Sequence, residues 1–391
     1  MRLALRLAWR GYGTTSPNPM VGAVLVKNGK VIGRGWHRRA GLPHAEIEAL
    51  RDAQKRGQNV RGATLYVTLE PCCTHGRTPP CTDAIVKAGV KRVVVGTVDP
   101  NPKHAGKGIT MLKNANIIAY AIGDSRGRPN LPDRLKAELQ TVATHCMELN
   151  EAFNHWIVHR TPFVTLKAAM TLDGKIATAE GESKWITGPK ARDYGMKLRQ
   201  GNDAILVGIN TILSDNPALT IRSKNIQHPP FNTQHSRLRR IVLDSMARTP
   251  LKSKVAGDNN SRLTTIVVSK LAPKSRVEAL AKQVDVLVAP TAAGQQQAKI
   301  SLPWLLRKLG AQNVTSLLVE GGGEVNASFL MNQLVHRLAF FYAPKILGGR
   351  DSRKAAGGIG VERIQDVIQL RDIKWKKLGA DLLMTARIAK A

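Results

Sequence analysis

The segment from residue 44 to residue 81 constrains the fold most, because three of its side chains can bind one metal ion only if distant parts of the chain meet. His44, Cys72 and Cys81 can supply one nitrogen and two sulfur ligands to a tetrahedral Zn²⁺, which leaves the fourth position for water. An open position of this kind is typical of catalytic zinc. Glu46 is not needed as a ligand and can move a proton between water and a leaving amine. The predicted chemistry is hydrolytic deamination.

The spacing of these residues differs from the zinc-deaminase signature, which is His-x-Glu followed by Pro-Cys-x-x-Cys. Here eight residues separate the two cysteine ligands. The longer gap is compatible with one site if Cys72 ends a loop and Cys81 opens a helix at 82–88, where the positive helix terminus favours thiolates. Two alternatives stay open: a structural zinc site closed by Cys73 or His75, and three unrelated cysteines in a reducing cytosol.

The composition places these motifs in a chain large enough for two domains. With 391 residues, 43% of them hydrophobic, the chain can bury two separate cores. Its four cysteines do not suggest a disulfide framework, and no apolar run approaches the roughly 20 residues that span a membrane. We therefore expect a cytoplasmic protein without a membrane association.

The formal net charge of +31 raises the question of a nucleic-acid partner. The excess of Lys and Arg is spread over both halves of the chain, no block of five consecutive cations occurs, and aromatic residues make up only 4%. A base-stacking surface needs aromatic side chains beside its cations, so it is poorly supported. We favour a diffuse basic surface with pockets for phosphate, and we expect no specific nucleic-acid partner.

The N-terminal part is expected to alternate strands and helices. Asn28-Gly29 is the strongest two-residue hairpin signal, and it separates two strand-like runs at 21–26 and 30–35. The further elements expected here are helices at 45–55 and 82–88 and strands at 64–69 and 90–96. This pattern predicts an α/β sandwich whose metal ligands lie at the starts of helices.

A Gly- and Pro-rich segment at 124–132, followed by a long helix at 133–156, marks the passage between two domains. We therefore expect a deaminase domain over residues 1–145 and a second α/β domain over residues 146–391. The elements expected in the second domain are strands at 163–170, 204–207 and 316–319 and helices at 189–199 and 324–333. Residues 222–240, rich in Asn, Gln, His and Pro, are expected to form a long surface loop.

A glycine turn, Gly321-Gly322-Gly323, lies between the strand at 316–319 and the helix at 324–333. Its backbone can approach an anion closely, and the free N–H groups at the helix start can bind that anion. A tight strand-to-helix turn in a protein core would have the same sequence. On this pattern alone both interpretations stay open.

Two sets of motifs together resemble one enzyme family. In the first half they are Asn18-Pro19-Met20-Val21-Gly22, Pro43-His44-Ala45-Glu46 and the run from Leu69 to Cys81, whose end Gly76-Arg77-Thr78-Pro79-Pro80-Cys81 is typical of the family and explains the eight-residue gap. In the second half they are Thr171-Leu172-Asp173-Gly174-Lys175, Gly181-Glu182-Ser183, Trp185-Ile186-Thr187, the run from Asp215 to Arg222, Glu320-Gly321-Gly322 and the run from Ala343 to Gly349. The chain resembles the bifunctional riboflavin-biosynthesis enzymes, which join a diaminohydroxyphosphoribosylaminopyrimidine deaminase to a 5-amino-6-(5-phosphoribosylamino)uracil reductase.

The resemblance implies a cytidine-deaminase-like α/β/α sandwich followed by a dihydrofolate-reductase-like α/β domain that uses NADPH. The first domain, with one Zn²⁺ per chain, would remove an amino group from the ring of 2,5-diamino-6-(5-phosphoribosylamino)pyrimidin-4-one. The second would reduce the ribosyl carbonyl of the product to a ribityl chain. We also expect a homo-oligomer, either a dimer or a tetramer.

The resemblance also assigns residues in the second domain. The positions that it implies to face NADPH are Ala169, Trp185, Thr211, Asp215, Gly322, Gly323, Glu324, Val325, Asn326, Ala327 and Ser328. The positions that it implies to face the substrate are Ser183, Arg199, Leu219, Arg222 and Glu320. The charges agree with this division, because Arg199 and Arg222 can clamp a phosphate with forked hydrogen bonds.

Two other functions compete with this interpretation. A nucleic-acid-editing zinc deaminase with a basic C-terminal domain would bind RNA or DNA with a steep dependence on salt. A non-catalytic, zinc-stapled nucleic-acid-binding protein would carry a fourth protein ligand on its metal.

Overall fold

The computed structural model describes residues 1–74, 79–123, 132–222, 238–290 and 299–389. The chain forms two compact units, residues 1–160 and residues 161–391. The boundary between the units therefore lies after Arg160, whereas the boundary expected from the sequence, between residues 145 and 146, lies inside a helix. That helix packs its apolar face against the first unit, so it belongs there.

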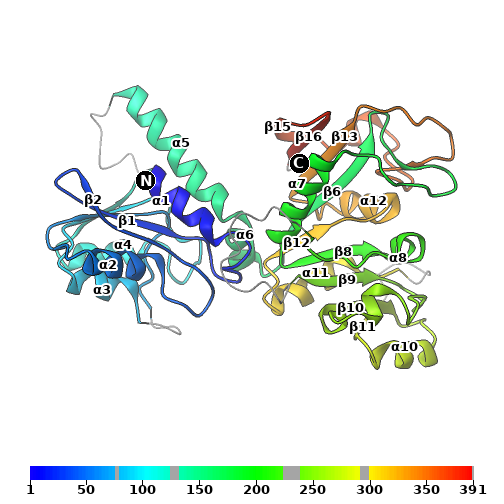
Figure 1. The fold of residues 1–391 in the computed structure, drawn as a ribbon, viewed down its shortest axis with the longest axis horizontal. Helices are drawn as coiled ribbons and strands as arrows, with labels where there is room; N and C mark the ends of the chain where they lie inside the picture. Colours follow the sequence, from blue (N-terminus) through cyan, green and yellow to red (C-terminus); the bar gives the residue numbers. More distant parts are fainter. Residues whose placement is uncertain (75–78, 124–131, 223–237, 291–298, 390–391) are drawn as a thin grey trace. The chain divides into compact units, whose positions relative to one another are not determined.

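The first unit, drawn from blue to blue-green in Figure 1, is built on a five-stranded sheet. Its strand order is β2-β1-β3-β4-β5. β1 pairs antiparallel with β2 and β3, whereas β3, β4 and β5 are parallel. The strands are β1 (Gly22–Lys27), β2 (Lys30–Trp36), β3 (Thr64–Val67), β4 (Arg92–Val95) and β5 (Ile118–Ala121). The helices are α1 (Arg2–Ala8), α2 (Ala45–Lys55), α3 (Cys81–Lys87), α4 (Lys107–Asn114), α5 (Asp133–Leu149) and α6 (Glu151–His159).

Helices cover both faces of this sheet, because successive strand residues point to opposite sides. Val93 and Val95 of β4 join one apolar core with α2, α3 and α4, whereas Val94 joins a second core with α1 and α5. The predicted α/β/α sandwich is therefore confirmed. The hairpin turn is confirmed as well, since Asn28 and Gly29 both have positive φ, at 50° and 73°, as a type I′ turn requires.

The close approach of α2 to the sheet depends on small residues. A Cβ atom on Gly35 of β2 would lie 2.2 Å from the carbonyl oxygen of Ala45, and one on Gly33 would lie 2.4 Å from that of Ala49. Ala45 and Ala49 are fully buried in this contact. The fit fixes the N-terminal end of α2 against the sheet, and this end carries the predicted metal ligand and proton carrier.

The second unit contains a nine-stranded sheet with the order β11-β10-β9-β8-β12-β6-β13-β16-β15. The strands from β11 to β13 run parallel, and β16 and β15 add antiparallel strands at one edge. These strands are β6 (Phe163–Thr171), β8 (Ala204–Gly208), β9 (Arg239–Leu243), β10 (Thr264–Ser269), β11 (Asp285–Ala289), β12 (Ser316–Val319), β13 (Arg337–Ala343), β15 (Leu370–Leu378) and β16 (Asp381–Ile388). A separate two-stranded sheet pairs β7 (Lys175–Ala177) with β14 (Arg353–Lys354).

Apolar cores lie on both faces of the large sheet. On β8, Leu206 belongs to a core with α11 and α12, whereas Ile205 and Val207 belong to a core with α8, α9 and α10. The helices of this unit are α7 (Pro189–Gln200), α8 (Ile209–Asp215), α9 (Lys254–Gly257), α10 (Lys274–Ala281), α11 (Leu302–Ala311) and α12 (Gly323–Met331). The second unit is thus an α/β domain, as predicted, and most of its large sheet is parallel.

Two expectations about local structure are wrong. The single helix expected at 133–156 is two helices, because Asn150 leaves the helical conformation at φ −118° and ψ 27°. Its side chain instead accepts a hydrogen bond from the N–H of Met20 at 2.7 Å and donates one to the carbonyl of Met20 at 2.9 Å. The loop expected at 222–240 ends earlier, since Arg239 and Arg240 already belong to β9, and its residues 223–237 lie outside the described residues.

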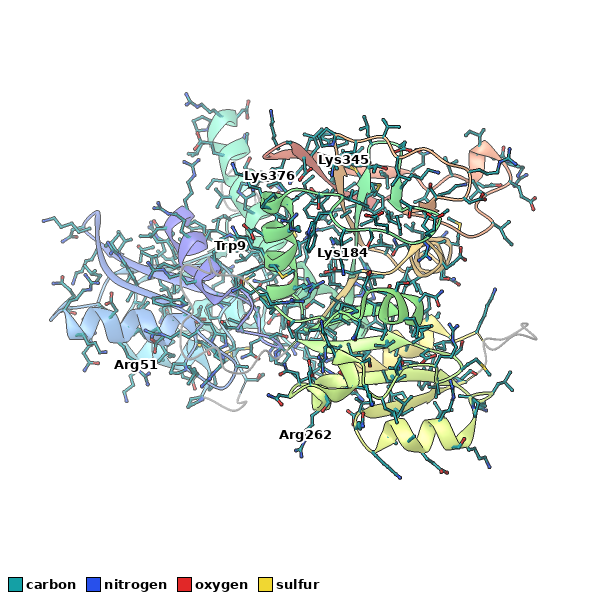
Figure 2. The ribbon with its side chains drawn as sticks, turned by 45° about the vertical axis from the view of Figure 1, so that its right-hand side comes forward. Trp9, Arg51, Lys184, Arg262, Lys345 and Lys376 are labelled. Atoms are coloured by element: carbon teal, nitrogen blue, oxygen red, sulfur yellow. The ribbon has the colours of Figure 1, made fainter. Side chains whose placement is uncertain are left out.

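The positive charge is distributed as the sequence suggested. Both units carry exposed basic side chains, among them Arg51 in the first unit and Arg262 and Lys376 in the second (Figure 2). Among the helices of the described segments, none combines the length and the apolar character needed to cross a bilayer.

Candidate active sites

Three elements of the first unit bring the predicted metal ligands together. His44 is the N-cap of α2, Cys72 follows β3, and Cys81 is the first residue of α3. The Nδ1 atom of His44 lies 3.5 Å from the Sγ of Cys72 and 3.4 Å from the Sγ of Cys81, and all three ligand atoms lie within 4.8 Å of one another. Tetrahedral zinc with bonds of about 2.0–2.3 Å places its ligand atoms about 3.3–3.8 Å apart. The two distances from the nitrogen to the sulfur atoms therefore already fit a tetrahedral zinc ion.

The alternative of a closed structural site has no support from Cys73. Its Sγ lies 3.9 Å from Nδ1 of His104, which is not one of the three candidate metal ligands. The other candidate for a fourth ligand, His75, lies outside the described residues. Within the parts of the chain that the structure describes, the cluster offers three protein ligands and an open fourth position.

Hydrogen bonds favour a thiolate at Cys72. The backbone N–H of Cys81 donates to the Sγ of Cys72 at 3.3 Å, at the positive start of α3. The thiol of Cys81 and the ring of His44 also bond this sulfur, and together these bonds lower the pKa of Cys72 against the effect of burial. The same bond to Cys72, together with burial, raises the pKa of Cys81. One ligand is therefore ready for a metal ion, and the second would lose its proton on metal binding.

Glu46 lies in the first turn of α2, two residues after the histidine ligand. Its side chain is buried, and its Oε2 atom has no hydrogen-bond partner in the described parts of the chain. Burial, with a smaller effect of the nearby Cys72 thiolate, raises the pKa of Glu46 to about 7. A buried carboxyl group with a pKa near neutrality and one free oxygen can both accept and donate a proton at physiological pH.

His37 is a residue of this site that the sequence analysis missed. It is 2% exposed, and its ring lies edge-on to that of His44 with centroids 5.2 Å apart. Its Nδ1 lies 3.1 Å from the carbonyl of Pro43, so we assign the proton to Nδ1, and Nε2 accepts from the amide of Asn18 at 3.1 Å. Burial lowers the pKa of His37, in agreement with a neutral ring. The motif that begins with Asn18 was the available signal, but it does not include His37.

In the second unit, a buried charge cluster lies where β12 ends. Arg199, in the last turn of α7, donates from Nε and Nη2 to the two carboxylate oxygens of Glu320, both at 2.9 Å. Lys167 of β6 adds an ion pair to Glu320 at 3.5 Å. Burial opposes ionisation of Glu320, but Lys167 and Arg199 outweigh it and lower the pKa of Glu320 to about 2. Lys167 was missed by the sequence analysis, although a lysine inside an apolar strand was the available signal.

The other predicted substrate residues differ in how accessible their side chains are. The guanidinium of Arg199 is already engaged, because its Nη1 also donates to the carbonyl of Thr220 at 3.0 Å. Arg222, its expected partner in a phosphate clamp, is exposed at the edge of the described segment. The side chain of Leu219 is 2% exposed and belongs to the core, so only its backbone is available to a substrate. Ser183 is half-buried.

The glycine turn opens toward free space at one residue. Gly322 is the N-cap of α12, and a Cβ atom there would meet no atom within 4 Å. On the other side the helix start is closed, since a Cβ atom on Gly323 would lie 2.5 Å from the carbonyl of Lys354. The carboxylate of Glu324 accepts the N–H of Gly358 at 3.1 Å. Because a Cβ atom on Gly322 would meet no other atom within 4 Å, an anion has room beside this residue.

Most of the remaining predicted cofactor residues lie on α12 or at the same edge of the sheet as this turn. Val325, Asn326, Ala327 and Ser328 continue α12 beyond Glu324. β8 and β6 flank β12 in the parallel sheet, so α8 with Thr211 and Asp215, and the end of β6 with Ala169, lie at the same carboxyl edge as Gly322. Trp185 is exposed, stacks 4.5 Å from the guanidinium of Arg192 and accepts a hydrogen bond from Lys345 through its carbonyl.

Comparisons with known proteins agree with both units. Residues 1–97 match the family model of the cytidine and deoxycytidylate deaminase zinc-binding region, and residues 162–384 match that of the RibD C-terminal domain. The chain is 40% identical to the riboflavin biosynthesis protein RibD of Aquifex aeolicus, over 98% of this chain and 96% of that protein. It is 36% identical to RibD of Escherichia coli, over 98% and 97%.

Solved structures give the same result. The chain is similar to RibD of Acinetobacter baumannii with a TM-score of 0.81 and 32% identity, covering 100% of this chain and 98% of that one. It is also similar, with a TM-score of 0.78 and 34% identity over 100% and 97%, to a diaminohydroxyphosphoribosylaminopyrimidine deaminase/5-amino-6-(5-phosphoribosylamino)uracil reductase of Thermotoga maritima. The matches confirm the α/β fold class and the order of the two domains, and nothing in them supports a nucleic-acid-editing enzyme. The chain therefore belongs to the RibD family of bifunctional riboflavin-biosynthesis enzymes.

Proposed function

We propose that the first unit deaminates 2,5-diamino-6-(5-phosphoribosylamino)pyrimidin-4-one and that the second unit reduces the product with NADPH. The observation that carries the first half is the convergence of His44, Cys72 and Cys81 beside the buried, unpartnered carboxyl oxygen of Glu46. A catalytic zinc site with three ligands and an adjacent carboxyl group is suited to hydrolytic deamination. The free thiols fit the reducing cytoplasm in which we place the reaction.

In the deaminase site, a bound zinc ion supplies an activated water at neutral pH. The protein residues hold the ligands and move the protons. His37 orients the ring of His44, and the N–H of Cys81 stabilises the thiolate of Cys72. Glu46 takes a proton from water and gives it to the departing amine, so that one water is consumed and one ammonia leaves.

In the reductase site, NADPH supplies the hydride that converts the ribosyl carbonyl to an alcohol. We place the cofactor pyrophosphate beside Gly322, where the backbone of the glycine turn is open and the start of α12 favours an anion. Glu320 stays ionised in its contact with Arg199 and Lys167, and these groups orient the sugar chain of the substrate. We place the substrate phosphate with the exposed Arg222, supported by the remaining N–H groups of Arg199.

We also propose that the chain forms a dimer or a tetramer. Sedimentation of the full chain over a range of concentrations tests this, and a monomer at every concentration would overturn it.

The variant Glu46→Gln tests the division of labour between the units. The amide has the size of the carboxyl group but cannot carry a proton, so ammonia release should fall by about a thousandfold or more. Zinc content should be unchanged, and reduction of supplied deaminated intermediate should proceed at the rate of the unmodified chain. Full ammonia release in this variant would remove Glu46 from the mechanism, and loss of both activities would contradict the separation of the two sites.

A further inference from the structure

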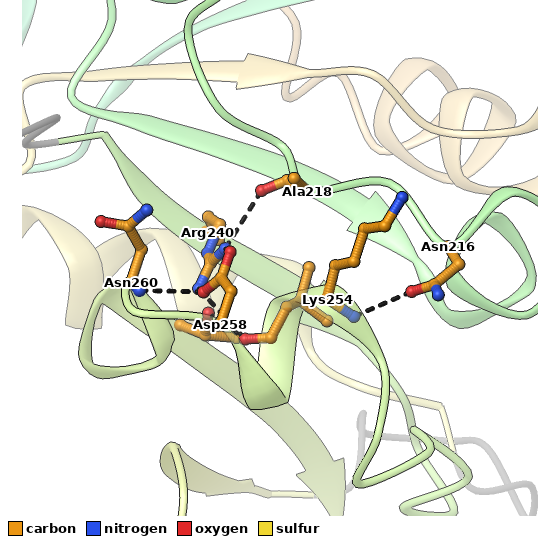
Figure 3. A network of polar contacts seen from close by, with 8 residues as sticks. Asn216, Ala218, Arg240, Lys254, Asp258 and Asn260 are labelled. Atoms are coloured by element: carbon orange, nitrogen blue, oxygen red, sulfur yellow. Dashed lines mark hydrogen bonds and ion pairs between the residues drawn. The ribbon is translucent and has the colours of Figure 1, made fainter.

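A buried arginine lies on β9, which β8 separates from β12 and the charge cluster at its end. Arg240, the second residue of β9, is 1% exposed and belongs to the largest fully buried side chains of the chain. Its two terminal nitrogens donate to the two carboxylate oxygens of Asp258, at 2.7 and 2.8 Å (Figure 3). Nη2 also donates to the carbonyl of Val255 at 3.1 Å, and Asp258 accepts the N–H of Asn260 at 2.9 Å. The pair is thus anchored to the segment around α9.

The arginine also reaches a segment far from it in sequence. Nη1 of Arg240 donates to the carbonyl of Ala218 at 3.0 Å, in the segment 216–222 that follows α8 (Figure 3). Two residues earlier, the side chain of Asn216 accepts the N–H of Lys254 at 2.8 Å. Both contacts tie this segment to α9 and its surroundings.

The backbone of this segment needs such support. Asn216 and Leu219 have positive φ, at 41° and 51°, a conformation that a branched side chain such as that of leucine rarely adopts. Ala218, whose carbonyl the arginine holds, lies directly before the strained Leu219. The hydrogen bond therefore acts at the point where the backbone turns Leu219 into the core.

The same segment also contacts the charge cluster of the reductase site. The carbonyl of Thr220 accepts a hydrogen bond from Nη1 of Arg199, whose other nitrogens hold Glu320. Two arginines, the buried Arg240 and the largely buried Arg199, thus hold the carbonyls of residues 218 and 220. A shift of the backbone at Ala218 would move the acceptor that orients Arg199.

We propose that Arg240 and Asp258 are positioning residues for the reductase site, which set the backbone of 216–222 so that Thr220 and Leu219 present their backbone groups correctly. This inference rests on the proposed reductase function. A salt bridge at this depth is seldom favoured over apolar side chains for stability alone. Arg240 joins three acceptors, the carbonyls of Ala218 and Val255 and the carboxylate of Asp258. An apolar side chain cannot hold these groups together.

The test compares Arg240→Lys and Arg240→Met with the unmodified full chain. Lysine keeps the charge beside Asp258 but, without the planar fork, cannot hold Asp258 and Ala218 together. We expect Arg240→Lys to raise the KM for deaminated intermediate about tenfold and to leave the affinity for NADPH within about threefold, since a small displacement of a positioned group can cost up to about a hundredfold. Ammonia release should be unchanged.

The matched control is Asp203→Asn. Asp203 also joins two segments, accepting the N–H and hydroxyl of Thr315 at 2.7 Å, but it lies at the amino ends of β8 and β12, away from the glycine turn. This variant should lower the thermal midpoint without changing the KM. If Arg240→Met does not fold, Asp258→Asn takes its place in the test. Asp258 is partly exposed, so its replacement should destabilise the fold less.

Hydrogen exchange of the ligand-free chain separates this inference from the proposed function. In the Arg240 variants, the amides of residues 216 and 218–222 should exchange at least about tenfold faster, while those of β12 stay protected. Unchanged exchange in 216–222, or a KM equal to that of the unmodified chain, would overturn the positioning role. If residues 216–222 exchange faster in the Arg240 variants but the unmodified chain oxidises no NADPH, the contacts of Arg240 are as proposed and the reductase proposal is refuted.

Discussion

Replacing Glu320 by glutamine should weaken the second unit in a way that depends on pH. Glu320 and Arg199 expose only 11% and 12% of their side chains, so their interaction is little screened by solvent. Lys167 and Arg199 outweigh burial and lower the pKa of Glu320 from 4.5 to about 2. A shift of that size corresponds to about 3 kcal/mol, since each pKa unit is worth about 1.4 kcal/mol.

The sign follows from the direction of the shift. The carboxyl pKa is lower in the folded chain than in the unfolded chain, so the ionised group stabilises the fold above pH 4.5. This stabilisation is lost as the pH falls toward 2, where the folded-state carboxylate is protonated. The free-energy difference between the unmodified chain and Glu320→Gln should therefore be about 3 kcal/mol at pH 5 to 7 and should shrink by about 2 kcal/mol at pH 3.

Native-state hydrogen exchange of the β12 amides, at several urea concentrations, measures this difference in the second unit alone. Glu362→Gln, at an exposed position, is the control for the loss of a carboxylate and should leave the free energy of unfolding unchanged. A difference that stays constant from pH 7 to pH 3 would refute the argument, because it would show that the charge of Glu320 does not stabilise the fold. Loss of NADPH oxidation should accompany the loss of stability.

Further variants test the ligand set and the two anion positions. Cys72→Ser should abolish zinc binding, whereas Cys73→Ser should keep one zinc per chain, and metal analysis of both decides between an open and a closed site. Arg222→Ala should raise the substrate KM about tenfold or more with little change for NADPH, because a charged hydrogen bond contributes about 1.5–3 kcal/mol. Gly322→Val should instead weaken NADPH binding with little change in the substrate KM, because its side chain fills the open space beside the turn. Steady-state titration of each ligand measures both effects, and the opposite pattern would show that the two anion positions are exchanged.

The sequence predicted best what depends on neighbouring residues. The bounds of α2 and the turn at Asn28-Gly29 follow from local patterns, and the structure has both as expected. The meeting of His44, Cys72 and Cys81 could also be predicted, because one zinc ion can bind all three only if the chain brings them together.

Features that depend on distant partners could not be predicted in the same way. The helix break at Asn150 has its cause in Met20, far away in the sequence. The contact of Lys167 with Glu320 exists only because β6 and β12 are neighbours in the sheet, an order that no local pattern specifies. Arg240 was expected at the end of a surface loop, because its acid partner and its carbonyl acceptor come from two other segments.

The stoichiometry of the two reactions tests the central claim most directly. The full chain, loaded with zinc, is incubated with 2,5-diamino-6-(5-phosphoribosylamino)pyrimidin-4-one and NADPH, and ammonia release and NADPH absorbance are followed in the same sample. We expect one ammonia and one oxidised NADPH for each product molecule, with NADPH oxidation delayed until deaminated intermediate has formed. NADPH oxidation without ammonia release, or no ammonia release from the zinc-loaded chain, would contradict it.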